Sequence, residues 1–127
     1  MPYDITWGAP GVLHFQFSGD MTALELVDCI IKSEQFLEAE SNHPFYVWVE
    51  VNTLRKVPGN TFQVLLRTGR LRSVPSGLIV VGATAYLMMV ARLIAITLWG
   101  IDYRPVFVSS PEEGQIALDE MLGAATQ

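Results

Sequence analysis

The side chains that could perform chemistry are few, and their spacing does not suit catalysis. The chain has one cysteine, Cys29, and two histidines, His14 and His43, but no motif pairs a nucleophile with a base. The neighbouring carboxylates Glu112 and Glu113 would diverge by about 100° on a helix, which does not suit an acid–base pair. Two His and one Cys cannot fill a tetrahedral zinc site without carboxylates. We therefore expect a protein that is not an enzyme and has no catalytic residue, metal or cofactor.

One segment has an unusual charge pattern. Although the formal net charge of the whole chain is −5, residues 55–72 contain no acid and five cations, namely Arg55, Lys56, Arg67, Arg70 and Arg72. Arg67 and Arg70 would share one helix face, and the first two cations are expected in the loop before that helix. Anions bind at such helix starts in parallel α/β sheets. The pattern predicts a site for an anionic ligand or an acidic partner, with a solvated helix face as the alternative.

A second feature is the apolar helix expected at residues 85–98. At about 100° per residue, one side is predicted to face the core: Tyr86, Leu87, Val90, Leu93, Ile94 and Thr97. The opposite side is also apolar except for one guanidinium: Met88, Met89, Arg92, Ile96 and Trp99. Because Met, Arg and aromatic residues are typical of interface cores, we expect this side to contact a protein, most simply a second copy in a homodimer. The alternatives are cover by the chain's own C-terminal helix and a cavity for a lipid or small apolar ligand, lined by Met88, Met89, Ile96 and Trp99.

The elements that position these residues alternate along the chain. Apolar runs predict strands at residues 5–7, 11–17, 45–51, 77–81 and 104–108. Helical spacing predicts helices at residues 22–37, 62–71, 85–98 and from 111 onward. The first and last of these begin with capping sequences, Thr22 with Glu25 and Ser110 with Glu113. The order ββαβαβαβα predicts an α/β fold with a mixed, mostly parallel sheet and helices packed against it.

The same patterns place several individual side chains. Alternation in the second strand puts His14 on its polar side, where we expect a solvated imidazole. Cys29 on the first helix is expected to be a buried or half-buried thiol. The inward face of the last helix is predicted to consist of Ile116, Ala117, Met121 and Leu122.

The chain resembles the SpoIIAA-like branch of the STAS superfamily (sulphate transporter and anti-sigma-factor antagonist domains). The resemblance covers nearly the whole chain and depends on four features: Ile-x-Trp at residues 5–7, Gly-Val-Leu at 11–13, Ser-Gly-Asp at 18–20 before a Thr-led helix, and Ser-Pro-Glu-Glu at 110–113. It implies a STAS-like fold and a regulatory, protein-binding role. The superfamily borders on SEC14-like lipid-binding folds, which is why a carrier of lipids or small apolar ligands is the alternative function.

The resemblance also implies a regulatory position. Antagonist-type STAS proteins carry a phosphorylatable serine at the head of their second helix, in an Asp-Ser-Ser-Gly-like sequence. The matching stretch is Pro58-Gly59-Asn60-Thr61, which lacks that sequence and offers only Thr61 as a hydroxyl. A phosphate there would add about −1.5 to −2 charges beside the cations at 55 and 56. The alternative is that Asn60 or Thr61 simply caps the helix.

Length and composition define the class of protein. With 127 residues, 50% of them hydrophobic and 17% charged, we expect a single STAS-like domain spanning 1–127. The single cysteine excludes an internal disulfide and favours the cytoplasm. Residues 77–100 contain one charge, Arg92, but divide into a strand and a helix, so we do not expect a transmembrane protein. The negative net charge argues against nucleic acid as a partner.

Overall fold

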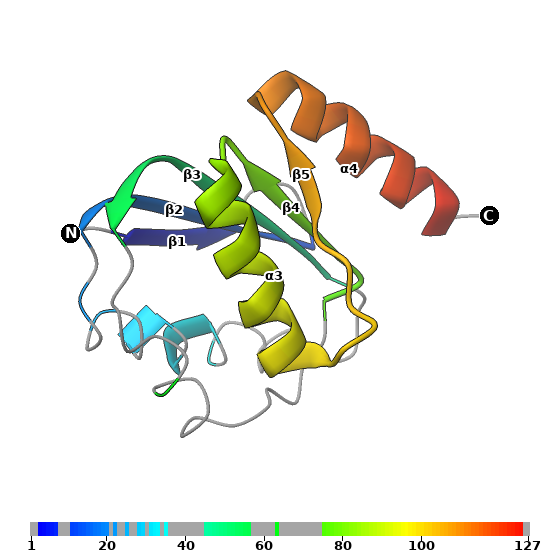
Figure 1. The fold of residues 1–127 in the computed structure, drawn as a ribbon. Helices are drawn as coiled ribbons and strands as arrows, with labels where there is room; N and C mark the ends of the chain where they lie inside the picture. The colour runs from blue at the N-terminus through cyan, green and yellow to red at the C-terminus, as the bar shows by residue number, and fades with distance from the viewer. Residues whose placement is uncertain are drawn as a thin grey trace.

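The computed structural model describes residues 3–7, 11–20, 22, 25, 28–29, 31–33, 35, 45–56, 63 and 75–125. The elements are β1 (Tyr3–Trp7), β2 (Val12–Asp20), β3 (Tyr46–Lys56), β4 (Gly77–Val81), α3 (Ala85–Trp99), β5 (Val106–Val108) and α4 (Pro111–Ala125). The described residues between 25 and 35 are helical, as predicted for the first helix, and so is Gln63 in the predicted second helix. Figure 1 shows the arrangement of these elements.

The five strands form one sheet in the order β1-β2-β3-β4-β5. The first two strands are an antiparallel hairpin in which Tyr3 lies opposite Phe17. The three remaining pairs are parallel. The predicted mixed, mostly parallel sheet is therefore confirmed.

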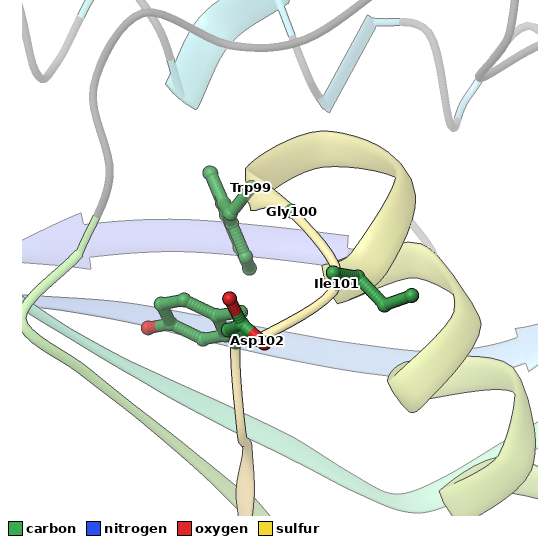
Figure 2. A pocket seen from close by; sticks show the side chains of 5 residues that line it. Trp99, Gly100, Ile101 and Asp102 are labelled. Carbon is green, nitrogen blue, oxygen red and sulfur yellow. The ribbon is translucent and has the colours of Figure 1, made fainter.

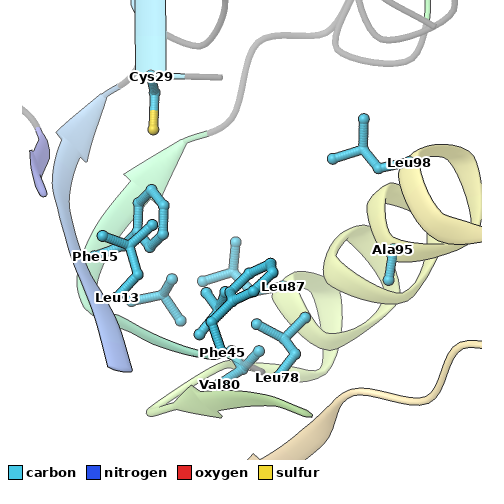
Figure 3. Packing of buried hydrophobic residues seen from close by; sticks show 11 residues of the cluster. Leu13, Phe15, Cys29, Phe45, Leu78, Val80, Leu87, Ala95 and Leu98 are labelled. Atoms are coloured by element: carbon cyan, nitrogen blue, oxygen red, sulfur yellow. The ribbon is translucent and has the colours of Figure 1, made fainter. Parts of the chain in front are cut away.

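Helices pack on both faces of this sheet. Successive residues of a strand point to opposite sides, so each face has its own buried cluster. On one face a buried cluster combines side chains of β2, β3, β4 and α3 with Cys29 (Figure 3), and its members include Leu13, Phe15, Val47, Leu78, Val80 and Leu87. On the other face Leu118 of α4 packs with a second cluster: Val12, Tyr46, Trp48, Ile79 and Val81. The interior strand β4 is buried along its whole length, as expected for a parallel strand covered on both faces.

Strands β2 and β3 extend further than the sequence predicts. They remain paired as far as Asp20 opposite Lys56, beyond two irregularities in the ladder. The hydroxyl of Thr53 donates to the carbonyl of Phe17 across this extension, at 3.3 Å. Arg55 and Lys56, predicted in a loop, therefore form the end of β3. The extension was missed because its mostly polar residues do not have the apolar pattern by which buried strands are recognised.

Two helix starts have the predicted caps. The backbone N–H of Thr22 donates to Glu25 Oε1 at 3.1 Å, and the N–H of Glu25 donates to Thr22 Oγ1 at 3.2 Å, which is a reciprocal capping box. At α4 the N–H of Glu113 donates to Ser110 Oγ at 3.3 Å. The Glu113 carboxylate accepts from the N–H and the hydroxyl of Ser109, at 3.0 and 3.1 Å, and not from the capping residue.

The inward face of α4 differs from the prediction. Ile116, expected inside, is 61% exposed, and Leu118 is buried in its place. Gly114 faces the Trp48 indole so closely that an added Cβ would lie 2.6 Å from Cη2. The glycine thus lets the helix approach the ring, and a hydrophobicity pattern gives such a residue no weight. Ala117, Met121 and Leu122 pack against the core as predicted.

Candidate functional site

An apolar surface runs along the outer side of α3. Tyr86, Met89 and Leu93 are 53%, 52% and 40% exposed, and Ile96 continues the row as a half-buried residue. Large apolar side chains with this exposure indicate an interaction site when they are contiguous, whereas isolated ones are common on the surface of any protein. We call these four residues the α3 stripe.

The opposite side of α3 fixes the helix to the sheet. Its buried residues are Leu87, Val90, Ala95 and Leu98, and burial of a large aliphatic side chain contributes about 1.5–3 kcal/mol. Thr84 caps the helix start by accepting from the N–H of Leu87 at 3.2 Å. Because the inner side already fills the core, the stripe is apolar surface in addition to what the fold buries.

The helix is rotated relative to the orientation predicted from the sequence. Tyr86 and Leu93, expected in the core, are exposed, whereas Ala95 is completely buried. Alanine contributes little to a hydrophobic pattern, so its burial, and with it the rotation of α3, could not be predicted from that pattern. The spacing of the stripe, 3, 4 and 3 residues, is the signal that could have found it.

The predicted interface residues lie in different surroundings. Met89 and Arg92 are exposed, and Met88, Ile96 and Trp99 are half-buried. The Arg92 guanidinium carbon lies 5.2 Å from the centre of the Phe107 ring, a cation–π distance. This contact directs the only charge of α3 toward β5, at the margin of the stripe.

A pocket of about 430 Å³ lies at the C-terminal end of α3 (Figure 2), where the described lining residues are Trp99, Gly100, Ile101, Asp102 and Tyr103. The rings of Trp99 and Tyr103 have centroids 5.0 Å apart. The Tyr103 hydroxyl donates to the carbonyl of Pro75 at 3.0 Å, and burial raises the pKa of this phenol. Trp99 Nε1 is buried without a hydrogen-bond partner. Of the cavity residues predicted from the sequence, Trp99 is the one that lines this pocket.

The predicted anion site lies mostly outside the described residues. Arg55 and Lys56 are in β3. The other predicted members lie outside the described ranges: Asn60, Thr61, Arg67 and Arg70. The site therefore stays a prediction.

A polar cluster that the sequence reasoning missed lies on the α4 side of the sheet. The Trp48 indole N–H donates to Glu50 Oε1 at 3.1 Å, and His14 Nε2 lies 3.5 Å from the same oxygen. The His14 and Trp48 rings meet edge to face, with centroids 5.7 Å apart. His14 Nε2 is buried and makes no hydrogen bond, although the side chain as a whole is 38% exposed. The imidazole is therefore partly solvated, as expected, with one nitrogen turned toward Glu50. Alternation alone shows which face a residue occupies and not that a carboxylate lies beside it.

The cysteine has surroundings typical of a structural thiol. Cys29 is 4% exposed, and burial, assisted by the Asp28 carboxylate and opposed by Lys32, raises its pKa from 9.0 to about 12. A thiol with so high a pKa is a poor nucleophile. Among the described residues, no group of three or more His, Cys, Asp or Glu side chains could hold a metal ion.

Comparison with known proteins identifies the fold. No family model matches the chain, and no curated protein matches it. A solved structure from Shewanella loihica PV-4, an uncharacterized protein from the DUF3478 family with a SpoIIAA-like fold, superposes with a TM-score of 0.61 at 14% sequence identity, over 91% of each chain. The chain has a SpoIIAA-like fold. The SpoIIAA-like architecture expected from the sequence is thereby confirmed.

In this SpoIIAA-like fold, the α3 stripe and the pocket belong to α3 and the residues that follow it, whereas the polar cluster belongs to β2 and β3. No helix in the described part of the chain is long and apolar enough to cross a membrane.

Proposed function

We propose that this SpoIIAA-like chain is a non-enzymatic binding module that acts through protein contact at the α3 stripe. The observation that supports the proposal is the exposure of Tyr86, Met89 and Leu93 on a helix whose other side is already buried in the core. Exposed contiguous apolar surface of this kind is typical of interaction sites. We further propose that the chain is one domain and works in the cytoplasm, as its composition predicts.

The size of complexes containing the chain tests this function. The tagged protein is measured by fluorescence correlation in buffer and in an extract of the cells that produce it. Met89→Glu places a charge in the stripe, and Ile116→Glu places the same charge on α4, at an isoleucine that is at least as exposed as Met89. We expect slower diffusion of the wild type and of Ile116→Glu than of Met89→Glu. Equal diffusion of all three proteins in both media would disprove the function.

A regulatory part of the proposal concerns an anion or a phosphorylated Thr61 near the start of the second helix. Its support is the five cations without an acid between residues 55 and 72. Calorimetric titration with inorganic phosphate should show binding to the wild type and loss of it in the double variant Arg67→Glu/Arg70→Glu. Equal binding by both proteins would remove the anion site from the proposal.

A second candidate function, a carrier of a small apolar ligand, follows from the SEC14-like resemblance, and the aromatic pair Trp99 and Tyr103 beside the pocket is where such a ligand would bind. The pocket volume of about 430 Å³ lies in the range of ligand sites, roughly 300–1,000 Å³. Native mass spectrometry of freshly purified protein should then show a bound molecule that Trp99→Ala loses. Protein of the chain's own mass alone, without any adduct, would contradict the carrier function.

A further inference from the structure

We propose that a second copy of this chain covers the α3 stripe, with the two α3 helices packed antiparallel about a two-fold axis. The inference rests on the proposed function, because it names the partner that the stripe binds.

The spacing of the stripe fits helix-to-helix packing. Tyr86, Met89, Leu93 and Ile96 are separated by 3, 4 and 3 residues, which is the a/d spacing of a coiled-coil seam. The positions expected to face away from such a seam include Leu87, Ala95 and Leu98, and these three are buried in the chain's own core together with Val90, which would lie at the edge of the seam. The helix therefore has one apolar side for its own sheet and another with the geometry to receive a helix.

The ends of α3 favour the antiparallel direction. The first turn contains no acidic residue and the last turn no basic residue, so no side chain within the helix compensates its dipole at either end. In an antiparallel pair, the positive end of each helix lies beside the negative end of the other. A parallel pair would place like ends together.

The stripe is also complementary to itself in this direction. Its midpoint falls between Met89 and Leu93, so a two-fold axis there sets Met89 against the partner's Leu93 and Tyr86 against the partner's Ile96. Both kinds of contact are apolar.

The charge pattern favours a second copy over other occupants. Arg92 is the only charged residue of α3, and its contact with Phe107 holds it beside the stripe. An acidic partner would find one cation here, and a helix lying on a membrane surface needs a polar face rich in Lys and Arg. A neutral, apolar, self-complementary stripe fits a copy of itself.

Sedimentation velocity of the purified full chain, over micromolar to millimolar concentrations, tests the proposal. The wild type and Ile116→Glu should dimerise with equal affinity. Met89→Glu should weaken the dimer by roughly tenfold or more, because each carboxylate would be buried against the partner's Leu93. Circular dichroism and thermal unfolding check that each variant is folded.

A charge exchange tests the direction of the helices. In Met89→Glu/Leu93→Lys, the antiparallel pair sets each glutamate against the partner's lysine, so dimer affinity should recover relative to Met89→Glu. A parallel pair would set glutamate against glutamate, and affinity would not recover. As a second readout, Met89→Cys and Leu93→Cys, each made in a Cys29→Ala background, should form a mixed disulfide faster than either forms one with itself.

The possible results separate the partner from the function. A purified wild type that stays monomeric at every concentration, or a dimer that Met89→Glu does not weaken, overturns the second copy as the partner. Slow diffusion in extract that depends on the stripe would then still support the proposed function, with another protein as the occupant. The antiparallel arrangement is overturned if the wild type dimerises but Met89→Glu/Leu93→Lys does not regain dimer affinity and Met89→Cys forms no mixed disulfide with Leu93→Cys.

Discussion

A glycine on α4 gives a sharp test of how this helix is seated. Replacement of a helical glycine by alanine normally stabilises a protein by about 1 kcal/mol, because alanine restricts the unfolded chain and has the higher helix propensity. At Gly114 the new Cβ would lie 2.6 Å from Cη2, 3.0 Å from Cζ3 and 3.2 Å from Cζ2 of Trp48. The indole is buried between the sheet and the helix, so either the helix or the ring must move.

The magnitude follows from two opposing effects. Overpacking a well-filled core costs about 1–3 kcal/mol, which equals or exceeds the helix-propensity gain of about 1 kcal/mol. We therefore expect Gly114→Ala to lower the free energy of unfolding by about 1 kcal/mol. Gly123 lies on the same helix with nothing within 4 Å of an added Cβ, so Gly123→Ala should raise it by about 0.5–1 kcal/mol.

Urea unfolding followed by circular dichroism measures both variants against the wild type. The two substitutions are chemically identical and lie in one helix, so the opposite signs isolate the contact with Trp48. If Gly114→Ala stabilised the protein as much as Gly123→Ala does, α4 would not approach the indole closely, and the account of this interface would be wrong.

Three further outcomes follow from local contacts. Thr84→Ala should lower the free energy of unfolding by about 1 kcal/mol through loss of the α3 cap, whereas Thr84→Ser should retain most of it in the same urea assay. Hydrogen bonds from the backbone and then the side chain of Ser109 lower the pKa of Glu113. Its ionised form therefore adds stability above the unfolded-state pKa, and this stability disappears as the pH falls through the folded-state pKa. The free energy of unfolding, measured at several pH values, should fall less on the acid side for Glu113→Gln than for the wild type. Parallel plots of this free energy against pH for the two proteins would contradict the prediction. With a pKa of about 12, native Cys29 has about a thousandfold less thiolate than a thiol of pKa 9, so thiol reagents should modify it far faster in urea than in the native state.

The sequence allowed prediction of most elements that have strong local signals. The capping pair Thr22 and Glu25 and the apolar strand at residues 77–81 are where the pattern places them. These signals lie within a few residues of one another, so one segment of sequence contains all the information that is needed.

The rotation of the helices could not be predicted in the same way. Gly114 allows α4 to approach the sheet closely, and Ala95 is the completely buried residue of α3, but both are too small to mark a hydrophobic face. The sequence pattern consequently assigned Tyr86, Leu93 and Ile116 to the core, although all three are exposed. Helix orientation depends on which small residue allows the closest packing, and that depends on the partner surface as well as on the helix.

The order of the strands has a consequence for how the chain can fold. Since neighbours in the sheet are also successive strands along the chain, each strand can add to an edge that already exists, and none has to be inserted between two partners. That growing edge remains available for pairing until β5 occupies it. With three residues, the last strand offers little backbone on which the strand of another molecule could nucleate aggregation.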